Sequence, residues 1–201
     1  MYISKNYILK VEEFVTDLLC DLPENLCYHN LKHTKEVVEA CKEIAKKSGL
    51  SASNTEIVII AAWFHDAGHA VTYFGHEKAG TKIAKEFLSK IHYPASKVNK
   101  VINCILATHY PPQPKNDLEK ILCDADMYHL SLDDYESRSF SLRKELETVT
   151  STEIPKQYWC DKNLEFLRDH CYFTTYGKKV LQFLKEKNLK KYFLSHCNCK
   201  Q

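Results

Sequence analysis

The sequence predicts a single all-α domain, and three observations support that fold class. Apolar residues recur at helical spacing along almost the whole chain of 201 residues. The chain contains only 5 Gly and 6 Pro, too few for a β fold rich in turns. Hydrophobic residues make up 44% of it, enough for a buried core without disulfide cross-links. We therefore expect one helical domain over residues 1–201, with neither an internal repeat nor a linker.

Several of the expected helices are bounded by a breaker or by a capping pattern. A capping-box pattern that begins at Ser53 should open the helix that runs to the His65–Asp66 pair. Breakers that should end other helices lie at Pro23, Gly49, Pro94 and the proline-rich segment 110–114. In chain order, the other expected helices span residues 5–20, 31–47, 76–91, 96–109, 117–129, 131–147, 161–173 and 175–194.

Charge and cysteine usage indicate a soluble cytoplasmic protein. The net charge of +2 gives no electrostatic reason to expect a nucleic-acid polymer or a membrane surface as a partner. The apolar stretch Ile57–Phe64 is far shorter than the roughly 20 residues needed to cross a bilayer. The 9 cysteines are scattered without a CxxC pair, and the first residues lack the apolar core of a signal peptide. The tail His196-Cys197-Asn198-Cys199 could bind a soft metal, but a frayed terminus is the simpler interpretation.

The stretch Ala61-Ala62-Trp63-Phe64-His65-Asp66-Ala67-Gly68-His69 ends an apolar run in titratable side chains. Adjacent helical residues point about 100° apart, so His65 and Asp66 can share one metal ion only if other helices supply the remaining ligands. A metal site here therefore requires isolated His or Asp residues elsewhere, each on an apolar helical face or at a helix end. The chain supplies them at His33, His76, His109 and Asp126.

Taken singly, a histidine on an apolar face is more often a satisfied core residue than a ligand, and this holds for His33 and for His109. The ordered set of four histidines and two aspartates is different, because that many buried polar groups would be costly unless an ion compensated them. Imidazole with carboxylate suits Mn, Fe, Co, Ni or Zn. No GxSxG elbow, phosphate-binding P-loop or Gly-rich dinucleotide turn is present to indicate a competing chemistry.

The ordered motifs resemble the HD superfamily of metal-dependent phosphohydrolases, an all-helical family. They are Tyr28-His29-Asn30-Leu31-Lys32-His33-Thr34, Ala62-Trp63-Phe64-His65-Asp66, Gly75-His76-Glu77-Lys78-Ala79-Gly80, Ala107-Thr108-His109, Asp124-Ala125-Asp126 and Leu142-Arg143-Lys144-Glu145-Leu146-Glu147. The chain looks like the small stand-alone HD proteins. It is also similar to the HD modules of bacterial cyclic-nucleotide-responsive defence proteins.

The resemblance implies a role for each matching residue. His33, His65, Asp66 and Asp126 would bind a primary metal, and Asp124 remains an alternative to Asp126. In the two-metal branch of the superfamily, Asp66 would bridge to a second ion held by His76 and His109. The resemblance leaves open whether one or two ions bind. It also implies that Asp66, His29 and His69 take part in catalysis, with either His29 or His69 as the proton donor.

The expected function is that of a metal-dependent, phosphodiesterase-like phosphohydrolase acting on a nucleotide or another small phosphate compound. A bound metal lowers the pKa of water towards neutrality, so that hydroxide can attack phosphorus. Two alternatives stay open, namely a nucleotide-sensing module without turnover and a di-iron oxygenase of the same superfamily. Four aromatic side chains could stack on a base, although packing is their commoner role: Tyr73, Phe74, Tyr110 and Tyr128. Three cations could hold phosphate or simply be solvated: Lys78, Lys115 and Arg143. A homo-oligomer is compatible with the sequence.

Overall fold

The structure is a computed structural model that describes residues 2–197, with side chains described for residues 6–195. It contains no strand among those residues, so the all-α prediction is confirmed. The tail His196-Cys197-Asn198-Cys199 lies outside the described side chains. The α-helices are α1 (Tyr2–Cys20), α2 (Leu31–Lys47), α3 (Ala52–Phe64), α4 (His76–Lys90), α5 (Ala95–Ala107), α6 (Asp117–Asp126), α7 (Tyr135–Thr150), α8 (Lys156–Asp169) and α9 (Gln182–Cys197). Short helices of other types are the 3₁₀ segments η1 (Ala67–Ala70) and η2 (Met127–Ser131) and the π-helical segment η3 (Gly177–Leu181), which leads into α9.

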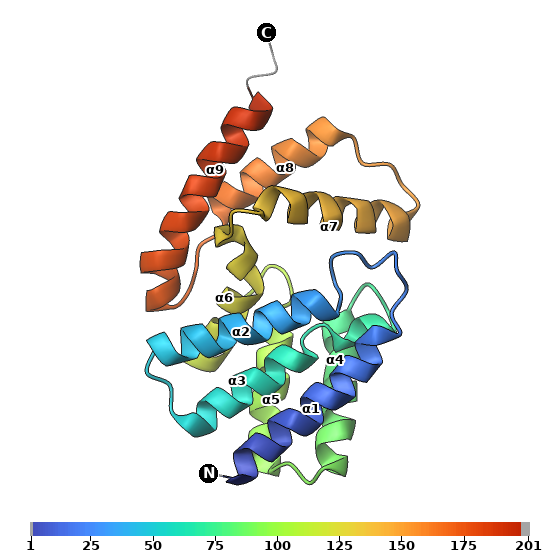
Figure 1. Ribbon diagram of the computed structural model, residues 1–201, viewed down its shortest axis with the longest axis vertical. Helices are drawn as coiled ribbons and strands as arrows, with labels where there is room; N and C mark the ends of the chain where they lie inside the picture. The colour runs from blue at the N-terminus through green and yellow to red at the C-terminus, as the bar shows by residue number, and fades with distance from the viewer. Residues whose placement is uncertain (1, 198–201) are drawn as a thin grey trace.

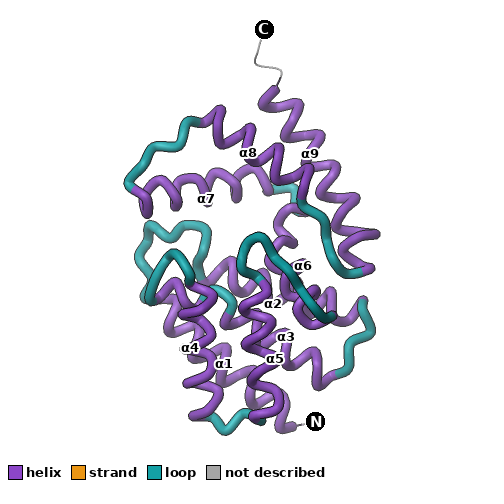
Figure 2. Tube along the Cα trace, turned by 180° about the vertical axis from the view of Figure 1, so that it is seen from behind, coloured by secondary structure: helices purple, strands orange, loops and turns teal. Residues whose placement is uncertain are grey.

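The helices form two packed groups. Helices α1 to α5 pack together around α3, whereas α7, α8 and α9 lie above α2 at the C-terminal end of the molecule, with α6 and η2 leading from one group to the other (Figures 1 and 2). The larger core includes apolar residues of α1 to α6. A smaller one consists of Leu130, Tyr135, Cys160, Leu164, Leu167 and Tyr192, and Met127 packs against both cores.

Helix α3 is the centre of the larger core. Every residue from Glu56 to Phe64 is buried, because α1, α2, α5 and α6 all pack around this helix. A helix that is apolar on every side is expected in such a place. The one carboxylate in this run, Glu56, accepts hydrogen bonds from Tyr93 Oη at 2.8 Å and Lys97 Nζ at 3.0 Å. These two hydrogen bonds offset the cost of burying the Glu56 carboxylate.

The observed boundaries correct several expected ones. The N-cap of α3 is Ser51, whose hydroxyl accepts from the Asn54 amide, so the cap predicted at Ser53 is wrong. Helix α8 begins directly after Pro155, five residues before the predicted start, because proline is compatible with the start of a helix. Helix α5 ends at Ala107, so His109 is not part of it. Helix α7 runs from Tyr135 to Thr150 and not over 131–147.

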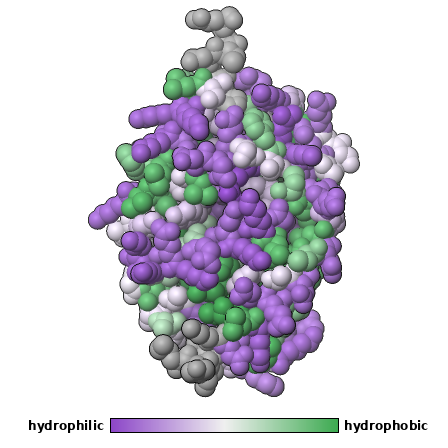
Figure 3. Space-filling view, viewed as in Figure 1, coloured by the Kyte–Doolittle hydropathy of each residue, from purple (hydrophilic) through white to green (hydrophobic). Residues whose placement is uncertain are grey.

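Hydrophilic side chains cover most of the face in Figure 3, with hydrophobic ones in smaller separate patches. Within the described part of the chain, no helix is both long enough and apolar enough to cross a membrane.

Two glycines allow η1 to lie directly against α4. A Cβ built on Gly68 would lie 1.9 Å from the carbonyl oxygen of His76 and 2.7 Å from the amide nitrogen of Gly80. A Cβ on Gly80 would lie 3.0 Å from the carbonyl oxygen of Phe64. Since these neighbours are backbone atoms of α3 and α4, they can move only if a whole helix moves. The close contact therefore fixes the start of α4 beside the end of α3.

We expect Gly68→Ala to lower the free energy of unfolding by about 2–3 kcal/mol or more, because the methyl group overlaps the α4 backbone. Chemical denaturation followed by circular dichroism would measure this. The matched control is Ala70→Ser, at an exposed position of the same turn, which should leave stability nearly unchanged. Equal stability of the Gly68 and Ala70 variants would contradict the close-contact explanation.

Candidate metal centre

Four of the predicted site residues converge from three parts of the fold. His33 Nε2 lies 3.5 Å from Asp66 Oδ2 and 3.3 Å from Asp126 Oδ1. His65 Nε2 lies 3.1 Å from Asp66 Oδ2 and 3.6 Å from Asp126 Oδ1. His33, His65 and Asp66 are buried, at 5%, 1% and 5% exposure, and the Asp126 side chain is 16% exposed. The structure thus brings two imidazoles and two carboxylates together in a largely solvent-excluded cluster.

Local backbone structure determines where each of these side chains points. His33 lies in the first turn of α2, where the Asn30 side chain caps the helix by accepting from the Lys32 and His33 amides. α3 ends at Phe64, His65 serves as its C-cap, and Asp66 has φ −105° and ψ 2° at the start of η1. Because the chain leaves the α-helical path at Asp66, the two neighbouring side chains can turn towards one point. Asp126 is the last residue of α6.

The cluster has polar atoms that the protein itself does not satisfy. His65 Nδ1 lies 2.7 Å from the Ala62 carbonyl oxygen, which can only accept, so Nδ1 carries a proton and Nε2 is the nitrogen that faces the carboxylates. His33 Nε2, His65 Nε2 and Asp66 Oδ2 are buried without a hydrogen-bond partner. Ligand atoms of His33, His65 and Asp66 lie within 4.8 Å of one another. A divalent metal ion fits this set, because it would satisfy the lone pairs and neutralise the carboxylates.

The mutual electrostatics of the cluster are strong. Burial acts to lower the pKa of His65, but the Asp66 and Asp126 carboxylates raise it well above its usual value. Burial acts to raise the pKa of Asp66, yet His65 keeps it well below the usual range. Burial likewise acts to raise the pKa of Asp126, which His33 and His65 hold low. Both carboxylates are therefore ionised, as ligands must be.

The second predicted group is only partly assembled. His76 Nδ1 lies 3.0 Å from the Tyr73 carbonyl oxygen, and its Nε2 lies 3.5 Å from Asp66 Oδ1. His109 is not beside Asp66, since its side chain is 71% exposed and its Nδ1 lies 2.9 Å from Glu77 Oε1. The expectation that an inward face of α5 continues to His109 is wrong. The helix ends at Ala107, two residues before His109.

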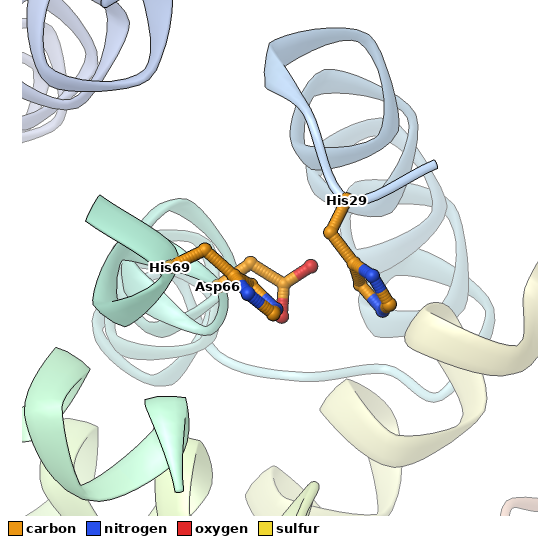
Figure 4. A group of neighbouring side chains, drawn as sticks. All are labelled: His29, Asp66 and His69. Atoms are coloured by element: carbon orange, nitrogen blue, oxygen red, sulfur yellow. The ribbon is translucent and has the colours of Figure 1, made fainter. Parts of the chain in front are cut away.

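The two candidate proton donors also lie beside Asp66, and Figure 4 shows their side chains directed towards it. Ligand atoms of His29, Asp66 and His69 lie within 4.8 Å of one another. The His29 and His69 rings stack at 4.6 Å between centroids, and the His69 and His76 rings at 4.0 Å. Burial, together with the nearby His29 and His76, lowers the pKa of His69 to about 3. His69 is therefore neutral at pH 7.

Glu145 of α7 is a site residue that the sequence did not single out. Its carboxylate is fully buried and accepts from the Tyr28 amide at 2.7 Å, the His29 amide at 3.0 Å and the Tyr73 hydroxyl at 3.0 Å. It is also hydrogen-bonded to His29 Nδ1. Burial acts to lower the pKa of His29, but the bond to Glu145 raises it. The likeness of the stretch around Glu145 to small HD proteins was the one signal in the sequence.

His129 is another residue that the sequence did not single out, and it lies next to the cluster. Its Nδ1 lies 3.0 Å from the Asp126 carbonyl oxygen, and Tyr28 Oη lies 3.2 Å from its Nε2.

Of the three cations considered for phosphate, Lys78 and Lys115 are exposed. Arg143 pairs with Glu147 at 3.1 Å. None of these contacts directs the three cations to the metal cluster.

Asp124 and Asp126 point to different places. Asp124 is fully buried and accepts from the Phe173 amide at 2.8 Å, the Thr174 amide at 2.8 Å and the Thr174 hydroxyl at 2.6 Å. It therefore anchors the segment before η3. Asp126 faces His33 and His65 instead. The geometry favours Asp126 as the metal ligand of the two.

A matched pair of substitutions separates these two roles. Asp124→Asn places an amide N–H against backbone donors, so we expect a loss of about 2–3 kcal/mol in stability with metal binding retained. Asp126→Asn should keep the fold and weaken metal binding at least about 10-fold. Denaturation curves and metal titrations of both variants would measure the effects. Loss of metal binding in Asp124→Asn alone would reverse the assignment.

Comparison with known proteins places this geometry in a family. No curated protein sequence matches the chain significantly. The fold is similar to that of a predicted HD superfamily hydrolase from an uncultured Thermotogales bacterium, with a TM-score of 0.64 and 22% identity, over 92% of this chain and 90% of that one. It is also similar to a protein from Lactobacillus plantarum, with a TM-score of 0.65 and 13% identity, over 94% and 95% of the two chains. The family model of the HD domain matches residues 30–131, from the N-cap of α2 to the end of η2, and the chain therefore belongs to the HD-domain family.

Proposed function

We propose that this protein is a metal-dependent phosphohydrolase that cleaves a phosphoester of a nucleotide or a similar small phosphate compound. The observation that carries the proposal is the buried cluster of His33, His65 and Asp66, whose inward nitrogen and oxygen atoms have no hydrogen-bond partner. HD-family membership and the predicted hydrolase of the same fold support a metal-dependent hydrolase at the level of the superfamily.

His33, His65, Asp66 and Asp126 would hold the primary ion. A divalent metal bound there lowers the pKa of water towards neutrality and polarises a phosphoryl oxygen. Two features of the protein prepare these four side chains for metal binding. The bond from His65 Nδ1 to the Ala62 carbonyl fixes the ring and leaves Nε2 free to bind. The histidines keep Asp66 and Asp126 ionised.

His29 is the residue placed to give a proton to the leaving group. Glu145 fixes the backbone of His29 through its amide and the ring through Nδ1, so the opposite edge of the ring faces Asp66. A buried carboxylate beside an imidazole favours the protonated form, which can donate. His69 lacks such a partner, and burial keeps it neutral. Of the two proton donors that the sequence left open, His29 and His69, these contacts therefore favour His29.

We further propose that the substrate is a small molecule and not a nucleic-acid polymer. The net charge of +2 provides no general attraction for a polyanion. Tyr73 lies at the site, with its ring 5.1 Å from that of His69. The ring of Phe74, which is 69% exposed, lies 5.2 Å from that of Tyr73. These aromatic groups support an organic phosphate with a flat group as the substrate.

The first functional test is a metal-supplemented substrate screen. The protein, loaded separately with Mn, Fe, Co, Ni or Zn, would be assayed with nucleoside monophosphates, cyclic nucleotides and nitrophenyl phosphoesters. We expect phosphoester cleavage that a chelator abolishes, and a loss of about 100-fold or more in Asp66→Ala. Asp117→Ala, at an exposed position of α6, is the control. Unchanged activity in Asp66→Ala, or a bound nucleotide that stays intact with every metal, would contradict the proposal.

The second test concerns proton donation. Glu145→Gln cannot stabilise a protonated His29, so we expect kcat to fall about 10- to 100-fold for a poor alkoxide leaving group. Hydrolysis of a nitrophenyl ester should fall much less, because nitrophenolate leaves without a proton. Metal content should not change. Glu147→Gln, which loses an ion pair with Arg143 on the same helix, serves as the control. Equal losses with both leaving groups would show that Glu145 acts only on structure.

A further inference from the structure

Helix α9 forms the outer edge of the C-terminal group of helices, and α8 packs against its inner side (Figures 1 and 2). Polar contacts fix the orientation of α9 about its axis. Asn188 Nδ2 donates to the carbonyl oxygens of Leu130 at 2.8 Å and Leu132 at 2.7 Å. The buried Lys185 Nζ donates to the carbonyl oxygen of His170. The opposite side of the helix therefore faces away from the protein.

Large apolar side chains lie on this outer side. Phe183 is 58% exposed and Leu194 is 61% exposed. Because eleven residues make almost three full helical turns, these two side chains fall on one stripe, roughly 16 Å apart along the axis. Val180, in η3 directly before α9, is exposed as well. Apolar side chains gathered on one face of a helix that already buries its other face indicate an interaction surface.

Lysines accompany the apolar side chains on the outer face of η3 and α9. The exposed ones are Lys178, Lys179, Lys187, Lys190 and Lys191. Lys187 and Lys190 lie between Phe183 and Leu194 on the same stripe, at steps of four, three and four residues. Lys187 Nζ lies 4.5 Å from the centroid of the Phe183 ring. The face thus alternates cationic and apolar groups along the helix.

The charge of the molecule is unevenly distributed. Residues 178–191 contain six lysines and one acidic residue, Glu186, although the whole chain has a net charge of only +2. The rest of the chain is therefore net negative. The small net charge gave no reason to expect a membrane surface as a partner, but it does not describe this helix, where positive charge is concentrated.

We propose that the outer face of η3 and α9 binds to the surface of an anionic lipid bilayer. The lysines would attract negatively charged head groups, and Phe183 and Leu194 would enter the boundary between head groups and acyl chains. This attachment would lie along the surface and not cross the membrane. It goes beyond the proposed function and does not depend on it, since these residues are not part of the candidate metal centre.

The kind of cation favours a bilayer over an acidic protein. Residues 178–191 contain lysine and no arginine. Lysine has a compact charge on a flexible stem, which suits a fluid layer of head groups, whereas the planar arginine fork is preferred where a carboxylate or phosphate is held in one place. The exposed Phe183 and Leu194 add the apolar groups that an interfacial helix needs.

The test is co-sedimentation of the full chain with lipid vesicles. Vesicles of phosphatidylcholine alone would be compared with vesicles that also contain phosphatidylserine. We expect binding to the anionic vesicles only, and weaker binding as the salt concentration rises, because ions screen the charges. The double variant Lys187→Glu with Lys190→Glu should bind about 30-fold or more weakly. Phe183→Ser should bind about 10-fold more weakly, because it loses the apolar contribution.

The matched control is Lys82→Glu with Lys85→Glu, at exposed positions of α4, which changes the net charge by the same amount. This control should bind anionic vesicles nearly as well as the unmodified protein. Equal losses in the α4 and α9 double variants would show attraction by net charge alone and would overturn the assigned face. Circular dichroism would check that each variant is folded.

Three other results would overturn the membrane proposal. One is the absence of binding to anionic vesicles at low salt. Another is equal binding to neutral and anionic vesicles, which would exclude the role of the lysines. The third is binding to poly-glutamate without binding to vesicles, which would assign the face to an acidic protein partner.

Discussion

The Asp66 carboxylate is the group on which the rest of the site depends. It lies at the point where the chain leaves the helical path of α3, and each of its oxygens faces a different set of imidazoles. A buried carboxylate without compensation would be strongly destabilising. The fold supplies the compensation by bringing His33 from α2 and His76 from α4 to the same place. The close packing of η1 against α4 through Gly68 and Gly80 makes this convergence possible.

The C-terminal helices contribute to the centre although they lie beyond the segment matched by the HD-domain model. Glu145 of α7 is the connection, since its buried carboxylate bonds to the backbone and ring of His29 and to the Tyr73 hydroxyl. One residue thereby holds the segment before α2 and the segment before α4 together. Asp124 makes a second connection between the helical groups through Phe173 and Thr174. The geometry of the candidate site thus depends on both groups of helices.

The three stacked imidazoles of His29, His69 and His76 have different hydrogen-bond partners. His29 has a carboxylate, His76 has a backbone carbonyl, and His69 has none within the protein. A carboxylate favours a protonated imidazole, a carbonyl accepts a hydrogen bond from one ring nitrogen, and the absence of a partner leaves both nitrogens available. Three similar side chains therefore differ in the hydrogen-bonding groups that they present to the site.

The sequence by itself determined the helical architecture and the core of the metal cluster. Apolar periodicity predicts which face of a helix turns inwards, and it singled out His33, His65, Asp66, His76, His109 and Asp126. The resemblance to the HD superfamily then implied that His33, His65, Asp66 and Asp126 share one metal. Periodicity ends where a helix ends, and therefore the exposure of His109, beyond Ala107, was decided only by tertiary structure. The same holds for the burial of His69 in a short turn and for the opposite directions of Asp124 and Asp126. The contact between Glu145 and His29 could not be predicted from the sequence. It spans 116 residues, so it depends on how the helices pack and not on local spacing.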